Sequence, residues 1–153
     1  MIASVSYDVE DEDARPPTFG LVVLQSEETL EDEFRYFLRD RRVVLHHTRI
    51  PSGEAVTLET LGAMEENLGS AIGLFPAGAR FDVIGYACTS AASVIGEARV
   101  SELITGARPE AASTNPATAV KAALGALGAQ RVSVLTPYNF AVTQDIVAML
   151  ETD

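Results

Sequence analysis

The residue with the clearest chemical potential is Cys88, the only cysteine among 153 residues. It follows the apolar, strand-like run 81–86, and Thr89, Ser90 and a helix-like stretch come directly after it. The unpaired N–H groups and the dipole at a helix start both favour the thiolate, the form of cysteine that acts as a base or nucleophile. A free cysteine is also commonly a small buried hydrophobic residue. The sequence around Cys88 therefore leaves two alternatives open, a reactive thiol and a core side chain.

Three hydroxyl residues suit the same chemistry. Thr89 and Ser90 could hold a substrate carboxylate and stabilise an enolate-like charge through their N–H groups and hydroxyls. Tyr138, which follows Pro137, could donate its phenol to the same anion. Simpler roles fit as well, since Thr89 and Ser90 are ordinary helix-capping residues and a partly buried tyrosine often makes one structural hydrogen bond.

Other polar residues give weaker signals. His46 and His47 are neighbours in a strand-like run, so their side chains face opposite ways and favour structural roles over a shared ligand or proton relay. Arg49 is expected to pair with one of the many acids. The glycines form neither a dinucleotide-binding fingerprint nor a phosphate-binding loop. With one cysteine and two histidines in the chain, no metal site is predicted.

The composition limits the classes of protein to which this chain can belong. Eleven basic and 22 acidic residues give a net charge of −11, which argues against sequence-independent binding to nucleic-acid phosphates. No apolar run approaches the roughly 18 residues that span a bilayer, and the acidic start resembles neither a signal peptide nor a membrane anchor. A single cysteine fits a reducing compartment, so we expect a cytoplasmic protein with no nucleic-acid or membrane partner.

Strand-like and helix-like segments alternate along the chain. They are expected at 19–24 (strand), 27–38 (helix, with Ser26 as its cap), 41–46 continuing towards 50 (strand), 57–74 (helix), 81–86 (strand), 93–104 (helix), 118–127 (helix), 132–135 (strand) and 141–150 (helix). This order predicts an α/β fold, a parallel sheet flanked by helices on both faces. Because right-handed crossovers bring the carboxyl ends of the strands to one edge, the loops 25–29, 88–90 and 136–139 should converge there.

Breaks in this pattern predict the domain organisation. Residues 1–17 look like a flexible acidic leader that ends in a Pro-Pro breaker. The loop-rich stretch 106–116 contains the expected boundary between a first α/β lobe at 18–112 and the start of a second lobe at 113–153. The second lobe is expected to be incomplete.

Several segments together resemble one superfamily. The segments 20–34 and 48–51 resemble the opening of maleate isomerases and arylmalonate decarboxylases, 82–90 (Asp-Val-Ile-Gly-Tyr-Ala-Cys-Thr-Ser) resembles their first catalytic loop, and 123–138 their passage into the second lobe. These enzymes belong to the Asp/Glu racemase superfamily, and the Cys-Thr-Ser-Ala and Leu-Thr-Pro-Tyr motifs are most similar to its ectoine-utilisation members. The resemblance covers about residues 18–150. It implies two Rossmann- or flavodoxin-like lobes related by a pseudo-twofold axis, with the substrate in the cleft between them and no cofactor.

The same resemblance assigns roles to residues. Cys88 matches the first-lobe cysteine, Thr89 and Ser90 the carboxylate-binding donors beside it, and Tyr138 the cleft tyrosine. Racemases of this superfamily use two thiols as opposed acid and base, whereas its isomerases use the first thiol as a nucleophile on a double bond. We therefore expect a cofactor-independent isomerase or racemase that acts on a small carboxylate.

Two departures from the family pattern narrow this expectation. Ser26 and Glu27 are expected to contact the substrate. The family often places Asn near Glu27 to bind a carboxylate, so Glu27 would repel a dicarboxylate and favour an amino-bearing or ectoine-derived substrate. The chain also ends at Asp153, before a second-lobe cysteine, so either it is truncated or another molecule, such as a second copy in a homo-oligomer, supplies the missing part. The alternatives are a non-catalytic small-molecule binding module and an inactive, oligomerising fragment.

Overall fold

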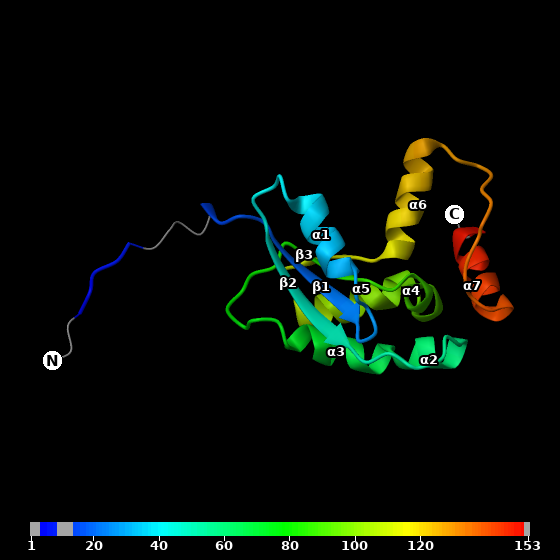
Figure 1. Cartoon of the computed structure of the whole chain (residues 1–153), viewed down its shortest axis with the longest axis horizontal. Helices are drawn as coiled ribbons and strands as arrows, with labels where there is room; N and C mark the ends of the chain where they lie inside the picture. The colour runs from blue at the N-terminus through cyan, green and yellow to red at the C-terminus, as the bar shows by residue number, and fades with distance from the viewer. Residues whose placement is uncertain (1–3, 9–13, 152–153) are drawn as a thin grey trace.

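The computed structural model describes residues 4–8 and 14–151, and its centre is a parallel four-stranded sheet (Figure 1). The strands are β1 (Thr18–Leu24), β2 (Val44–Ile50), β3 (Val83–Tyr86) and β4 (Ala112–Thr114). Their order in the sheet is β2-β1-β3-β4. The strand order therefore reverses between β1 and β3, and the crevice outside the carboxyl ends at such a point is the usual ligand site of an open α/β sheet.

Strand β1 lies inside the sheet because its apolar run is buried on both faces. Val22 and Val23 are fully buried, which is typical of a parallel strand covered by helices. Gly20 is closely packed, since a Cβ at this position would lie 3.0 Å from side-chain atoms of both Ile84 and Phe75, which would have to shift by a few tenths of an ångström. The tight fit holds β1 against β3 and brings their ends together at one edge of the sheet.

Helices cover the two faces of the sheet unequally. They are α1 (Leu30–Leu38), α2 (Leu58–Ala63), α3 (Glu65–Gly73), α4 (Thr89–Ile95), α5 (Glu97–Ala107), α6 (Pro116–Leu127) and α7 (Phe140–Glu151). Helix α3 packs on β1 and β2, and α5 packs on β4 and α3, so the main core lies on this face. Figure 1 shows α1 on the other side of the sheet, where none of its residues is buried.

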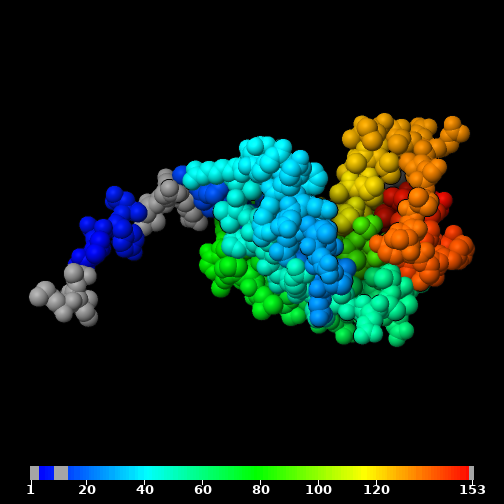
Figure 2. All heavy atoms as spheres, viewed as in Figure 1, coloured from blue at the N-terminus to red at the C-terminus, as the bar shows by residue number. Residues whose placement is uncertain are grey.

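The face of the sheet between α1 and α6 is hollowed. A cavity of about 320 Å³ lies there, bordered by Leu21 of β1, Phe34 of α1 and Ala119 of α6. Figure 2 shows the notch, with α6 and the chain that follows it standing away from the main body. The described chain therefore leaves apolar surface open on one side of its sheet.

The predicted α/β class and the first three strands are confirmed, with changes at the helices. The helix predicted at 57–74 is divided at Met64 into α2 and α3. The helix predicted at 93–104 begins earlier, at Thr89, and is divided at Gly96, whose φ of +92° strongly favours glycine.

The fourth predicted strand is wrong. Residues 132–135 form no strand, and Val132, Val134 and Leu135 are exposed. The alternating pattern is present, but no strand of the described chain lies alongside to take its backbone hydrogen bonds. The fourth strand is instead β4, which pairs with β3 within a stretch predicted to be a loop and which crosses the predicted lobe boundary at residue 112. Three residues of small and polar type are too few to give a hydrophobic signal.

The predicted leader at 1–17 lies partly outside the described residues, which include only 4–8 and 14–17 of it. Arg15 donates two hydrogen bonds to the Asp82 carboxylate, at 2.7 and 2.9 Å, and the N–H of Thr18 donates to the same carboxylate at 2.7 Å. The Arg15 guanidinium, followed by the Thr18 N–H, lowers the pKa of Asp82. This ion pair fixes the point at which β1 begins.

Candidate active site

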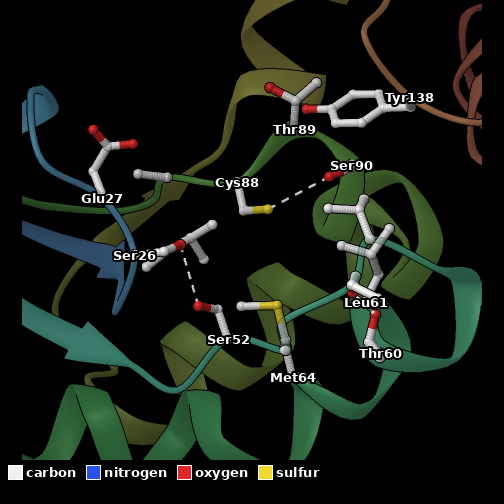
Figure 3. A pocket seen from close by; sticks show the side chains of 15 residues that line it. Ser26, Glu27, Ser52, Thr60, Leu61, Met64, Cys88, Thr89, Ser90 and Tyr138 are labelled. Carbon is white, nitrogen blue, oxygen red and sulfur yellow. Dashed lines mark hydrogen bonds between the residues drawn. The ribbon is translucent and has the colours of Figure 1, made fainter.

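The ends of β1, β2 and β3 border a cavity of about 370 Å³ at the carboxyl edge of the sheet (Figure 3). Helix α2, the start of α4 and the segment before α7 complete its wall. The lining residues are Leu24, Ser26, Glu27, Ser52, Gly53, Ala55, Val56, Thr60, Leu61, Met64, Ala87, Cys88, Thr89, Ser90 and Tyr138. All six residues that the sequence analysis placed in a site are among them, so the structure brings the six together.

Cys88 lies at the centre of this group, between β3 and α4 (Figure 3). Its backbone is extended, and its Sγ accepts a hydrogen bond from the N–H of Ala91 at 3.4 Å. Sγ also lies 3.7 Å from the Ser90 hydroxyl. Only 7% of Cys88 is exposed, and the residue borders the cavity. Cys88 is thus a buried side chain that caps α4 and also borders the cavity, a position compatible with either alternative.

A buried tyrosine lies beneath the thiol. The side chain of Tyr86 is fully buried, and its hydroxyl donates to Met64 Sδ at 3.6 Å. Burial raises the pKa of Tyr86 far above its usual range, and the nearby Cys88 side chain raises it further. Tyr86 therefore remains a neutral hydrogen-bond donor beside Cys88 across the whole working pH range of a protein.

The loop after β1 is organised by the Glu27 carboxylate. Its Oε1 accepts hydrogen bonds from the N–H groups of Glu28, Thr29 and Leu30 at 3.0, 2.8 and 3.1 Å. The sequence predicted Ser26 as the cap of α1, but Glu27 satisfies the free N–H groups, and Thr29, the residue before α1, makes no side-chain cap bond. The N–H of Thr29, followed by that of Leu30, lowers the pKa of Glu27, so its carboxylate is ionised at neutral pH.

Two further side chains hold this loop in place, that of Arg49 in β2 and that of Ser52, which follows β2. Arg49 donates to the main-chain oxygens of Leu24 and Glu27 at 2.9 and 2.8 Å and pairs with Glu31 at 2.7 Å. The sequence prediction that Arg49 pairs with an acid is confirmed. Ser52 donates to the Ser26 hydroxyl at 3.2 Å across the cavity wall (Figure 3).

Ser52 was missed by the sequence analysis, which assigned it no role. The available signal was its position, because Ser52 follows the carboxyl end of a predicted parallel strand. Thr60 and Met64 were missed too, and they carried no signal, since residues of a helix reach the cavity only through tertiary packing.

Tyr138 reaches the cavity by another route than the one predicted. It does not follow a strand, but lies in a bend just before α7. Asn139 anchors this segment, since its Nδ2 donates to the main-chain oxygen of Val56 at 3.0 Å and its Oδ1 accepts from the N–H of Val142 at 3.1 Å. Figure 3 shows Tyr138 and Glu27 on opposite sides of Cys88.

Residues to which the sequence analysis gave structural roles lie outside the cavity. His46 stacks edge-on against Phe81 at 5.4 Å, while the pKa of His47 is lowered mainly by burial. Within residues 4–8 and 14–151, no group of three or more His, Cys, Asp or Glu side chains could hold a metal ion. The same described chain contains no helix with the length and apolar character needed to cross a membrane.

No family model matches the chain. Among curated proteins it is 33% identical to a maleate isomerase from Nocardia farcinica over 144 residues, covering 88% of this chain and 57% of the relative. The sequence similarity to this maleate isomerase therefore extends well beyond the loop around Cys88.

Solved structures of maleate isomerases share its fold. The enzyme from Pseudomonas putida superposes with a TM-score of 0.73 at 28% identity, and 88% of this chain matches 58% of that one. A Cys-to-Ser variant of the Nocardia farcinica maleate cis-trans isomerase, which contains a covalently bound succinylcysteine intermediate, gives a TM-score of 0.74 at 34% identity with the same coverage. This chain spans little more than half the length of these maleate isomerases.

Proposed function

We propose that this chain belongs to the Asp/Glu racemase superfamily and carries the nucleophilic half of a cofactor-independent isomerase site for a small, unsaturated carboxylate. The observation that carries this proposal is the position of Cys88 in a cavity whose other polar groups are mostly hydroxyls, within a chain similar in sequence and fold to maleate isomerases. The covalent succinylcysteine in one of those relatives supports a nucleophilic thiol. A reducing cytoplasm would keep Cys88 free.

The proposed reaction begins with addition of the Cys88 thiolate to a cis carbon–carbon double bond conjugated to a carboxylate. A C–S bond forms, and the π electrons move onto the carboxylate as an enediolate. Rotation about the resulting single bond and expulsion of the thiolate give the trans isomer, so no proton or electron is gained or lost overall. The hydroxyls of Thr89, Ser90 and Tyr138 border the cavity and would stabilise the enediolate charge.

Isomerisation suits these residues better than racemisation does. Racemisation by thiols requires an acid and a base on opposite faces of one carbon, and the described residues that border this cavity supply one thiol. Nucleophilic addition and elimination require one thiol and an anion-stabilising wall. Cys88 and the hydroxyls around it provide both.

We further propose that a second molecule, most simply another copy of this chain, covers the open side of the site. Support comes from the apolar side chains exposed around α6 and α7, since Leu127, Leu135 and Phe140 are 80%, 98% and 79% exposed. Sedimentation over a dilution series should show a concentration-dependent dimer. A monomer at every concentration would contradict this part of the proposal.

The direct test is turnover of small cis-alkenoates by the wild-type chain and by Cys88→Ser, followed by proton NMR. We expect cis-to-trans conversion that survives desalting and treatment with EDTA, and its loss in Cys88→Ser. Ser70→Ala is the control, because Ser70 lies on α3 away from the cavity and donates only to a neighbouring main-chain oxygen. Ligand binding without turnover in the wild type would instead indicate a non-catalytic binding module.

A further inference from the structure

The charge of the cavity is unbalanced. Among the described residues that border it, Glu27 is the only one with a charged side chain at neutral pH besides any thiolate at Cys88, and no Lys, Arg or His is present. The remaining polar side chains are hydroxyls, which can bind one carboxylate but contribute no positive charge. A dicarboxylate would therefore meet one net negative charge and no compensating cation.

Glu27 presents this charge from a fixed position. Its Oε1 accepts all of the hydrogen bonds from the N–H groups of Glu28, Thr29 and Leu30 and from the Thr29 hydroxyl, which leaves Oε2 outside that network. The nearby Arg49 is directed elsewhere, because it binds main-chain oxygens of the loop, pairs with the Glu31 carboxylate and does not border the cavity. Figure 3 shows Glu27 on the side of Cys88 opposite to Tyr138.

We infer that Glu27 is a specificity residue that binds a cationic group, and that the site accepts a monocarboxylate carrying an ammonium or similar group rather than a dicarboxylate. The carboxylate of such a ligand would lie among the hydroxyls near Ser90 and Tyr138, and its cationic end beside Glu27. This inference rests on the proposed function for the location of the site. It extends that proposal by assigning the class of substrate, an amino-bearing unsaturated acid.

Three ligands of nearly equal size test the inference. Maleate carries two negative charges, maleamate carries one, and cis-4-aminobut-2-enoate is a zwitterion. Binding is measured as protection of Cys88 from iodoacetamide, an uncharged reagent whose own approach does not depend on the charge of Glu27. Protection requires binding but no turnover, so a chain that binds without catalysing would refute the proposed function and still test this inference.

The wild-type chain should bind the zwitterion on the order of tenfold more tightly than maleate, from the interaction of unit charges about 6 Å apart at a partly exposed site. In Glu27→Gln the ratio should fall below about threefold, and maleate should bind better. Glutamine keeps an acceptor oxygen for the three N–H groups, so the loop should persist. Glu28→Gln is the matched control. It removes the same charge from the neighbouring residue, whose side chain does not border the cavity.

Three outcomes would overturn the inference. They are equal or tighter binding of maleate by the wild type, an unchanged ratio in Glu27→Gln, and the same loss of preference in Glu28→Gln. Absence of protection by the zwitterion at millimolar concentration would count against it as well. A thermal unfolding scan of each variant separates these outcomes from misfolding.

Discussion

Replacing Arg49 with methionine should release the loop that carries Ser26 and Glu27. Arg49 makes two short hydrogen bonds to main-chain oxygens of this loop and an ion pair of 2.7 Å with Glu31. Hydrogen bonds from a charged donor are worth about 1.5–3 kcal/mol when buried, and the 45% exposure of the Arg49 side chain reduces this contribution. We therefore expect Arg49→Met to lower the free energy of unfolding by about 1–2 kcal/mol. The methionine keeps most of the aliphatic packing.

Urea unfolding at neutral pH measures this loss, and iodoacetamide protection of Cys88 reports on the loop. We expect the preference for cis-4-aminobut-2-enoate over maleate to weaken in Arg49→Met, because Glu27 is no longer held in place. Arg35→Met is the control, since Arg35 makes a 2.8 Å ion pair with Asp32 at 60% and 86% exposure and should change stability by less than about 0.5 kcal/mol. The reasoning is refuted if both variants lose the same stability and the ligand preference is unaltered.

Three further predictions concern stability. The folded-state pKa of Asp82 is lowered, so its ion pair contributes stability above the unfolded-state pKa and loses it as the pH falls through the folded-state pKa. Asp82→Asn should therefore lower the free energy of unfolding in urea by about 1 kcal/mol at pH 7 and by less at pH 3. The raised pKa of Tyr86 acts in the opposite direction, because its contribution to stability is complete below about pH 10 and falls as the pH rises. Tyr86→Phe should therefore flatten the alkaline part of the plot of unfolding free energy against pH. Ile104→Ala, at a fully buried site, should cost about 2–4 kcal/mol, whereas Leu127→Ala at 80% exposure should cost less than about 0.5 kcal/mol by the same measurement.

The sequence predicts those parts of the fold that depend on local pattern. β1 and β3 are continuous apolar runs, and their loops were expected to meet because parallel crossovers allow few arrangements. Cys88 was singled out as a candidate site residue from local pattern too, since small hydroxyl residues after an apolar run indicate a strand end followed by a helix start. The local sequence around the candidate site and the main topology of the sheet can therefore be predicted from the sequence alone.

Features that depend on what lies beside a segment were not predictable. Residues 132–135 have the pattern of a strand but no neighbouring strand within the described chain, whereas β4 has a neighbour and almost no pattern. The division at Met64 likewise has no proline to mark it, and Met64 accepts the hydrogen bond from the buried Tyr86 hydroxyl there. Tyr138 borders the cavity through the anchor at Asn139, although the strand invoked for its position is absent.

Two substitutions at Cys88 separate its structural role from its chemical role. Serine is among the preferred N-cap residues, and its hydroxyl can accept the N–H of Ala91 as Sγ now does, so Cys88→Ser should change the free energy of unfolding by less than about 0.5 kcal/mol. Alanine offers no acceptor, so Cys88→Ala should cost about 1 kcal/mol. Under the proposed function both variants lose turnover, because neither supplies a thiolate. Equal destabilisation by both would show that Sγ is held by packing and not as a cap, and turnover by the serine variant would remove the thiol from the reaction.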